Sequence, residues 1–91
     1  MNSVHVEFAA SLRRHVECDP QNVTAGTLLQ VLEAAFVAAP ELAHYVMDDQ
    51  RNIRKHVAVF IDREMVMDRQ NLARTVPPGS RVLVIQALTG G

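Results

Sequence analysis

Alternating apolar and polar residues predict strands at both ends of the chain. Val4, Val6 and Phe8 alternate with polar neighbours, which predicts a half-buried strand with these three residues on one face. The stretch 81–87 is the most strand-like in the chain and predicts the last strand. Both segments are strongly apolar, so we expect them to lie side by side in the centre of a sheet.

Further strands are predicted between these two. A second strand is expected between His15 and Thr24, forming a hairpin with the first, although turn-forming residues lie in its middle. Residues 56–61 predict a third strand, a tight turn follows at 62–63, and 64–67 form a short partner strand. Residues 71–75 are expected to form a single helical turn, and 77–80 a turn.

The central part of the chain carries a helical pattern. Thr27 can cap the first turn, and Gln30 three residues later completes a capping box. Apolar residues then recur at helical spacing as far as Ala39, and Pro40 is expected to end the helix. This stripe comprises Leu28, Val31, Leu32, Ala35, Phe36 and Ala39. A short second helix is predicted over 41–47, with Leu42, Tyr45 and Val46 facing inward, and 48–54 are expected to form a surface loop.

This order of elements predicts an α+β fold. One main helix should pack across a mixed sheet of four or five strands. The first and last strands should pair in parallel, because the helix lies between them as a crossover. This is the ubiquitin-like β-grasp arrangement. We expect a β-grasp domain over residues 1–87 and a flexible Gly-Gly tail over 88–91.

Composition narrows the possible functions. The 91 residues correspond to one domain, and hydrophobic residues make up 48% without any Trp, so the core must be aliphatic. The net charge is −1 with mixed signs, which does not favour nucleic acid as a partner. Cys18 is the only cysteine, so no intrachain disulfide is possible. We read no signal peptide and no membrane-spanning run. A cytoplasmic protein is expected.

Other reactive groups do not form familiar sites. The four histidines (His5, His15, His44 and His56) lack metal-ligand spacing, so we expect no metal. No motif prepares a base for Cys18, and the pair at 48–49 lacks the other ligands of a calcium loop. The carboxylate of Gly91, at the end of Leu88-Thr89-Gly90-Gly91, is therefore the strongest reactive candidate.

Several motifs together resemble the MoaD/ThiS sulfur-carrier proteins. The residues concerned are Phe8-Ala9 with Leu12-Arg13, Val59-Phe60-Ile61-Asp62 followed by Glu64, Pro78-Gly79-Ser80-Arg81-Val82, and Gly90-Gly91. The stretch 54–62 looks closer to the CysO-like branch. One departure is Pro78-Gly79-Ser80, where the family usually has Asp-Gly-Asp. Gly79 keeps the conformational freedom that the turn needs.

The resemblance implies a chemistry for the tail. A ubiquitin-activating-type adenylyltransferase would use ATP to form an acyl-adenylate at Gly91, and a sulfur donor would displace AMP to leave a thiocarboxylate for a sulfur-accepting synthase. This chain would bind no cofactor and would be a protein cosubstrate or a small synthase subunit, not an enzyme. Leu88, Thr89 and Gly90 would thread into the partner, and together with Gly91 these four residues reach roughly 13 to 14 Å when extended.

The resemblance also implies a docking surface for these partners. Its apolar positions correspond to Phe8, Met65 and Ile85, and the alternative is that they are core residues. Cysteine, thiamine, molybdopterin and other sulfur metabolites all use such carriers. Two other functions fit the same sequence: a ubiquitin-like modifier joined to lysines through Gly91, and a non-catalytic protein-interaction module.

Overall fold

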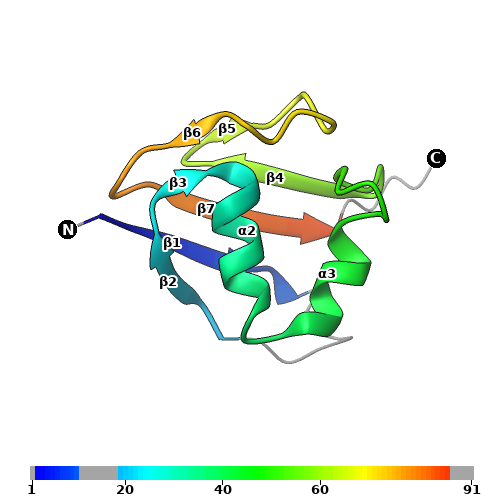
Figure 1. The fold of residues 1–91 in the computed structure, drawn as a ribbon, viewed down its shortest axis with the longest axis horizontal. Helices are drawn as coiled ribbons and strands as arrows, with labels where there is room; N and C mark the ends of the chain where they lie inside the picture. The colour runs from blue at the N-terminus through cyan, green and yellow to red at the C-terminus, as the bar shows by residue number, and fades with distance from the viewer. Residues whose placement is uncertain (1, 11–18, 87–91) are drawn as a thin grey trace.

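The computed structural model describes residues 2–10 and 19–86, in which strands precede and follow a pair of helices (Figure 1). The predicted second strand is observed over its last four residues. The predicted third strand begins one residue later than expected. The elements are β1 (Ser3–Phe8), β2 (Gln21–Thr24), β3 (Gly26–Thr27), α2 (Leu28–Phe36), α3 (Pro40–Val46), β4 (Val57–Ile61), β5 (Glu64–Met65), β6 (Thr75–Val76) and β7 (Arg81–Gln86).

The described strands form one mixed sheet of five strands in the order β2-β1-β7-β4-β5, with a two-stranded pair of β3 and β6 beside it. β1 and β7 pair in parallel, and β7 is also antiparallel to β4. β1 is antiparallel to β2, as the predicted hairpin requires. The first and last strands are therefore adjacent, with β7 at the centre, as predicted. This topology confirms the β-grasp fold.

The capping box at the start of α2 is confirmed. The Gln30 N–H donates to Thr27 Oγ1 at 3.2 Å, and the Thr27 N–H donates to Gln30 Oε1 at 3.0 Å. The helix ends at Phe36, earlier than expected, and all six residues of the predicted apolar stripe are buried. Pro40 lies at the first turn of α3, where its missing N–H costs little, so it begins a helix instead of ending one.

Helix α3 differs from the prediction in one side chain. Leu42 and Val46 are buried, but Tyr45 is 39% exposed, so the expectation that Tyr45 faces inward is wrong. Leu42 and Val46 are four residues apart and define the inward stripe of this short helix. Tyr45 lies beside that stripe, where its polar end can stay in water.

The helical turn predicted over 71–75 is also wrong. Thr75–Val76 instead form β6, which pairs with β3. The backbone N–H groups of Leu28 and Leu29 donate to the carbonyl oxygens of Arg74 and Leu72, at 2.9 and 3.0 Å. These donors belong to the first turn of α2, where a helix has no internal acceptors. Segment 72–74 supplies the acceptors where it passes the start of the helix.

The core lies between the sheet and the two described helices. On the sheet side it contains Val4, Val6, Phe8, Val57, Val59, Ile61, Val82 and Val84, and α2 covers this face (Figure 1). The predicted turn at 77–80 is present. Gly79 has a φ of +86°, and its N–H donates to the Ser3 carbonyl oxygen at 2.8 Å. This contact fixes the start of β7 against β1.

Candidate functional site

The base of the predicted tail is anchored in the middle of the sheet. Gln86 ends β7 and is paired with Val57 at the start of β4. β7 has a hydrogen-bonded neighbour on each side, so its direction is fixed. The predicted domain limit at residue 87 and the tail residues Leu88, Thr89, Gly90 and Gly91 lie outside the described residues. Gln86 is therefore the described residue closest to Gly91 in the sequence.

The face of the sheet that α2 does not cover carries a continuous apolar row. Leu83 of β7 is paired with Glu7 of β1 on one side and with Phe60 of β4 on the other, and Phe60 is paired with Met65 of β5. Side chains of directly paired residues project to the same face. This row therefore crosses four strands, from an acidic side chain at Glu7 to the edge at Met65.

A second apolar pair extends this row toward the tail. Ile85 is paired with Ala58, two residues further along β7 from Leu83. Leu83, Ile85 and Phe60 are partly buried, and Met65 is 39% exposed. We call Ala58, Phe60, Met65, Leu83 and Ile85 the sheet-face patch. It lies on the strand that leads into the tail, so a partner bound to it would be close to the base of the tail.

The structure separates the three predicted docking residues. Met65 and Ile85 lie on the sheet-face patch. Phe8 is 1% exposed and stacks on Phe36 of α2, with ring centroids 5.9 Å apart. Phe8 is paired with the buried Val84, so it points to the helix side of the sheet. The expectation that Phe8 lies on an exposed docking surface is wrong, and its core alternative is confirmed.

Leu83 and Phe60 are members of the patch that the sequence reasoning missed. Strand alternation contains the necessary information, because Leu83 and Ile85 are two residues apart and must share a face. The same rule places Phe8 on one face with Val4 and Val6, and both of these residues are buried.

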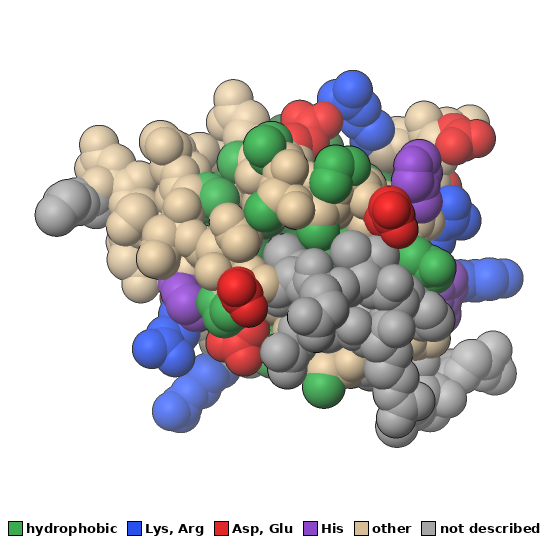
Figure 2. Space-filling view, turned by 90° about the horizontal axis from the view of Figure 1, so that it is seen from below, with side chains coloured by type: hydrophobic (Ala, Val, Ile, Leu, Met, Phe, Trp, Pro, Cys, Tyr) green, Lys and Arg blue, Asp and Glu red, His purple; other side chains and the backbone are tan. Residues whose placement is uncertain are grey.

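A histidine and a carboxylate lie next to each other on β1, on the uncovered face of the sheet. His5 Nε2 lies 3.7 Å from Glu7 Oε1, and His5 Nδ1 lies 3.3 Å from Asn22 Oδ1. Seen from below the view of Figure 1, basic, acidic and histidine side chains are spread round the edge of the molecule, with hydrophobic side chains between them (Figure 2). This mixture on the visible side fits docking to a protein better than the uniform basic surface that nucleic acid requires.

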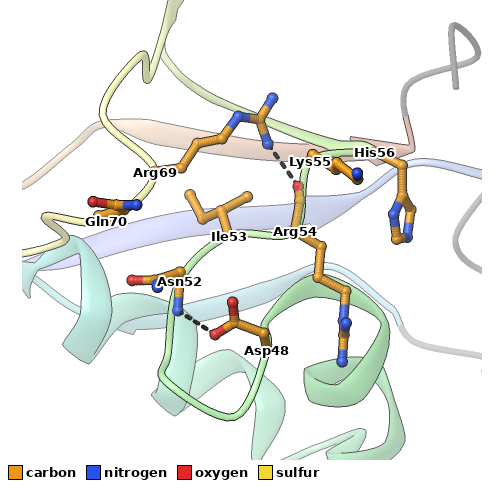
Figure 3. A pocket seen from close by; sticks show the side chains of 8 residues that line it. All are labelled: Asp48, Asn52, Ile53, Arg54, Lys55, His56, Arg69 and Gln70. Atoms are coloured by element: carbon orange, nitrogen blue, oxygen red, sulfur yellow. Dashed lines mark hydrogen bonds between the residues drawn. The ribbon is translucent and has the colours of Figure 1, made fainter. Parts of the chain in front are cut away.

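A separate group of basic residues lies where β4 begins, next to the end of β7. The predicted surface loop 48–54 leads into it, although Ile53 in this loop is 4% exposed and belongs to the core. Arg54, Lys55, His56 and Arg69 line a hollow of about 390 Å³ together with Asp48, Asn52, Ile53 and Gln70 (Figure 3). Since Val57 follows His56 directly and is paired with Gln86, this hollow lies at the tail end of the sheet.

Other candidate groups do not assemble into a site. Among residues 2–10 and 19–86, no cluster of three or more His, Cys, Asp or Glu side chains could hold a metal ion. His15 and Cys18 lie outside the described residues. In the same described part of the chain, no helix has the length and apolar character needed to cross a membrane.

The topology and the uncovered apolar face define a ubiquitin-like β-grasp protein. The model of the ThiS family matches residues 6–91, so the chain belongs to the ThiS family. No curated protein matches the chain significantly. The CysO-like branch suggested by residues 54–62 stays a prediction.

Solved structures show the same fold. The crystal structure of SAMP1 from Haloferax volcanii is 21% identical, with a TM-score of 0.79, 98% of this chain covered and 99% of that chain covered. The solution structure of the small archaeal modifier protein 1 from Methanosarcina acetivorans is 15% identical, with a TM-score of 0.78 and coverage of 100% and 98%. The Haloferax volcanii HVO 2177 protein is 23% identical, with a TM-score of 0.73 and coverage of 98% and 86%.

Proposed function

We propose that this protein is a sulfur carrier that works through the carboxylate of Gly91. The carboxylate attacks the α-phosphorus of ATP on a partner adenylyltransferase, which forms an acyl-adenylate and releases pyrophosphate. A sulfur donor then attacks the acyl carbon, the bond to AMP breaks, and a thiocarboxylate remains for a sulfur-accepting synthase. The observation that carries this proposal is the family match, which runs through residue 91 and includes Gly90-Gly91.

The anchored strand supports this chemistry because it gives the tail a fixed base. Gly91 is five residues beyond Gln86 in the sequence, and a fully extended chain spans roughly 16 to 18 Å over that distance. That reach is sufficient to enter a partner's nucleotide site while the folded domain stays outside. The two glycines carry no Cβ, so they suit a narrow channel.

Ordering the tail requires affinity from elsewhere in the molecule. Fixing a residue's backbone costs on the order of 1 kcal/mol or more. The sheet-face patch can supply this affinity, because partly buried apolar side chains on a flat sheet surface favour docking of another protein. In this proposal Met65 and Ile85 keep their predicted role, and Leu83 and Phe60 join them.

The chain acts as a protein cosubstrate in this scheme, and the catalytic groups and ATP belong to the partner. In the cytoplasm the protein would bind three partners in turn: the adenylyltransferase, the sulfur donor and the acceptor synthase. The product pathway would be one that makes cysteine, thiamine, molybdopterin or another sulfur-containing metabolite.

Intact mass spectrometry tests the proposal directly. The protein is incubated with ubiquitin-activating-type adenylyltransferases, ATP and sulfide, and we expect exchange of one oxygen for sulfur at Gly91. Deletion of Gly91, or addition of one residue after it, should abolish the exchange while leaving the fold intact. Absence of exchange with every such enzyme would overturn the proposal.

Conjugation through Gly91 is the second candidate function. It is favoured by the similarity to proteins described as small archaeal modifier proteins. In that case the activated carbonyl is attacked by a lysine amine, AMP leaves and an amide forms. Covalent adducts in cells that disappear when Gly91 is deleted would identify the modifier, whereas a thiocarboxylate without adducts would identify the carrier.

A further inference from the structure

Lys55 is the only lysine in the sequence and lies at an exposed turn beside the end of β7. The Val57 N–H donates to the Arg54 carbonyl oxygen at 3.0 Å, which closes the four-residue turn 54–57. Val57 is paired with Gln86, the last residue of β7. The turn therefore presents Lys55 close to the point from which the tail continues.

Arg69 holds this turn in one conformation. Its Nη1 donates to the carbonyl oxygen of Arg54 at 2.6 Å and also to that of Val57. The Ile53 N–H donates to the Arg69 carbonyl oxygen at 3.0 Å, and Arg54 Nε donates to the carbonyl oxygen of His44 in α3 at 2.8 Å. The turn is thus tied to two other segments (Figure 3). A surface that is already ordered loses little entropy when it binds a partner.

The turn also concentrates positive charge. Arg54, Lys55 and Arg69 line the hollow, and its one carboxylate is that of Asp48. Asp48 Oδ1 already accepts backbone N–H groups of residues 50 and 52 at 2.9 and 3.0 Å. Within the described residues, none of the three cations has an acidic side chain at salt-bridge distance. This local excess contrasts with the net charge of −1 for the whole chain.

We propose that the turn 54–57 docks against an acidic surface of the activating enzyme, at the rim of the opening that receives the tail. This inference rests on the proposed function. The phosphates of ATP are a less suitable occupant, because an extended tail places Gly91 roughly 16 to 18 Å beyond Gln86. Lys55 therefore lies at the entrance of the channel, and acidic side chains there would complement its charge.

ATP–pyrophosphate exchange with the adenylyltransferase that thiocarboxylates the wild-type protein provides the first test. Lys55→Glu should raise the KM for the carrier about fivefold to tenfold at low salt and leave kcat unchanged. Lys55→Arg should behave like wild type. The difference should shrink at high salt, because screening weakens exposed charges. Arg63→Glu, the same charge reversal at the opposite end of β4, should have little effect.

Zero-length carbodiimide cross-linking provides the second test. The reagent activates a partner carboxylate, an amine of this chain attacks it, and an amide forms as the urea leaves. The amines available in this chain are Lys55 and the N-terminal amine, so the cross-linked peptide identifies the contact. We expect a peptide joining Lys55 to an Asp or Glu of the enzyme, and this cross-link should be lost in Lys55→Arg, since arginine does not react.

The outcomes separate this inference from the function on which it rests. One contradicting outcome is that the wild-type protein supports ATP–pyrophosphate exchange while Lys55→Glu has an unchanged KM, and another is that Arg63→Glu raises the KM equally. In either case the proposed docking of the turn 54–57 is wrong and the carrier function stands. Cross-links confined to the N-terminal amine would also overturn the proposed docking of the turn 54–57. If the wild-type protein is activated by no adenylyltransferase, both proposals fail.

Discussion

Asp62 and Arg81 are joined by two hydrogen bonds at the end of the sheet opposite the tail. The Asp62 N–H donates to the Arg81 carbonyl oxygen at 2.7 Å, and the Arg81 N–H donates to Asp62 Oδ1 at 3.0 Å. Asp62 has a φ of 56°, a left-handed conformation that Asp and Asn tolerate better than most residues. This one residue therefore both turns the chain from β4 into β5 and fixes the start of β7.

We expect Asp62→Ala to lower the free energy of unfolding by about 1 to 2 kcal/mol. The change removes the acceptor for the Arg81 N–H and places alanine in a left-handed conformation. Asp62→Asn keeps an oxygen acceptor and should cost less than about 0.5 kcal/mol. Asp62→Gly removes the backbone strain of the left-handed conformation but also removes the acceptor. Its loss in the free energy of unfolding should therefore fall between those of Asp62→Ala and Asp62→Asn. Urea unfolding measures all three, and equal losses for Ala and Asn would contradict this account.

A double-mutant cycle at Gly26 and Gln30 should reveal strong coupling. A Cβ on Gly26 would lie 2.5 Å from Gln30 Oε1, the atom that caps the Thr27 N–H. Gly26→Ala should therefore displace the Gln30 side chain and cost about 0.5 to 1 kcal/mol. In a Gln30→Ala background the same change should be close to neutral. Additive losses in thermal unfolding would show that the cap is not the cause.

Substitutions at Phe8 and Ile85 should distinguish an effect on stability from an effect on partner binding. Phe8→Ala should cost about 3 to 5 kcal/mol, because the ring is fully buried against α2. Ile85→Ala should cost only about 0.5 to 1.5 kcal/mol, since Ile85 is partly exposed on the other face. Denaturant unfolding measures these values. In the exchange assay Ile85→Ala should raise the KM for the carrier, and a normal KM would remove Ile85 from the docking surface.

Arg69 should be a major local stabiliser of the tail end of the sheet. Arg69→Ala removes a charged donor shared by the carbonyl oxygens of Arg54 and Val57, and should cost about 1.5 to 3 kcal/mol. Arg69→Lys should recover only part of the lost stability, because an ammonium keeps the charge but cannot reproduce the planar guanidinium. Hydrogen exchange should accelerate at the amide of Val57. An unchanged hydrogen-exchange rate at the Val57 amide in Arg69→Ala would contradict the role of Arg69 in holding the turn 54–57.

Much of the fold could be predicted from local sequence patterns. Thr27 and Gln30 predict the capping box because both partners lie within one turn. The helix between the first and last strands predicts their parallel pairing. The small sheet of β3 and β6 could not be predicted, because two-residue strands carry no alternation. Its position depends on Leu28 and Leu29 finding backbone acceptors in a segment more than 40 residues away.

The candidate site was predicted only in part, for a related reason. Alternation shows which residues share a face, but only the packing of α2 shows which face is covered. Resemblance puts Met65 and Ile85 on the docking surface, but it also puts Phe8 there, whereas the alternation of Phe8 with Val4 and Val6 puts all three on one face. The turn 54–57 had no periodic signal, and its role depends on the long-range contact with Arg69.

The position of β7 also affects how the protein is made. Among the described strands, the central one is the last to be synthesised, and its parallel neighbour β1 is the first. On the ribosome, a nascent chain that lacks β7 has no partner for the inner edges of β1 and β4, and it must bring distant segments together before folding can finish. Under the proposed function, the Gly-Gly end therefore becomes available only on molecules whose translation has passed the strand that completes the described sheet. Under the same proposal, prematurely terminated chains would lack both the central strand and the Gly-Gly end, so they could not compete for the adenylyltransferase.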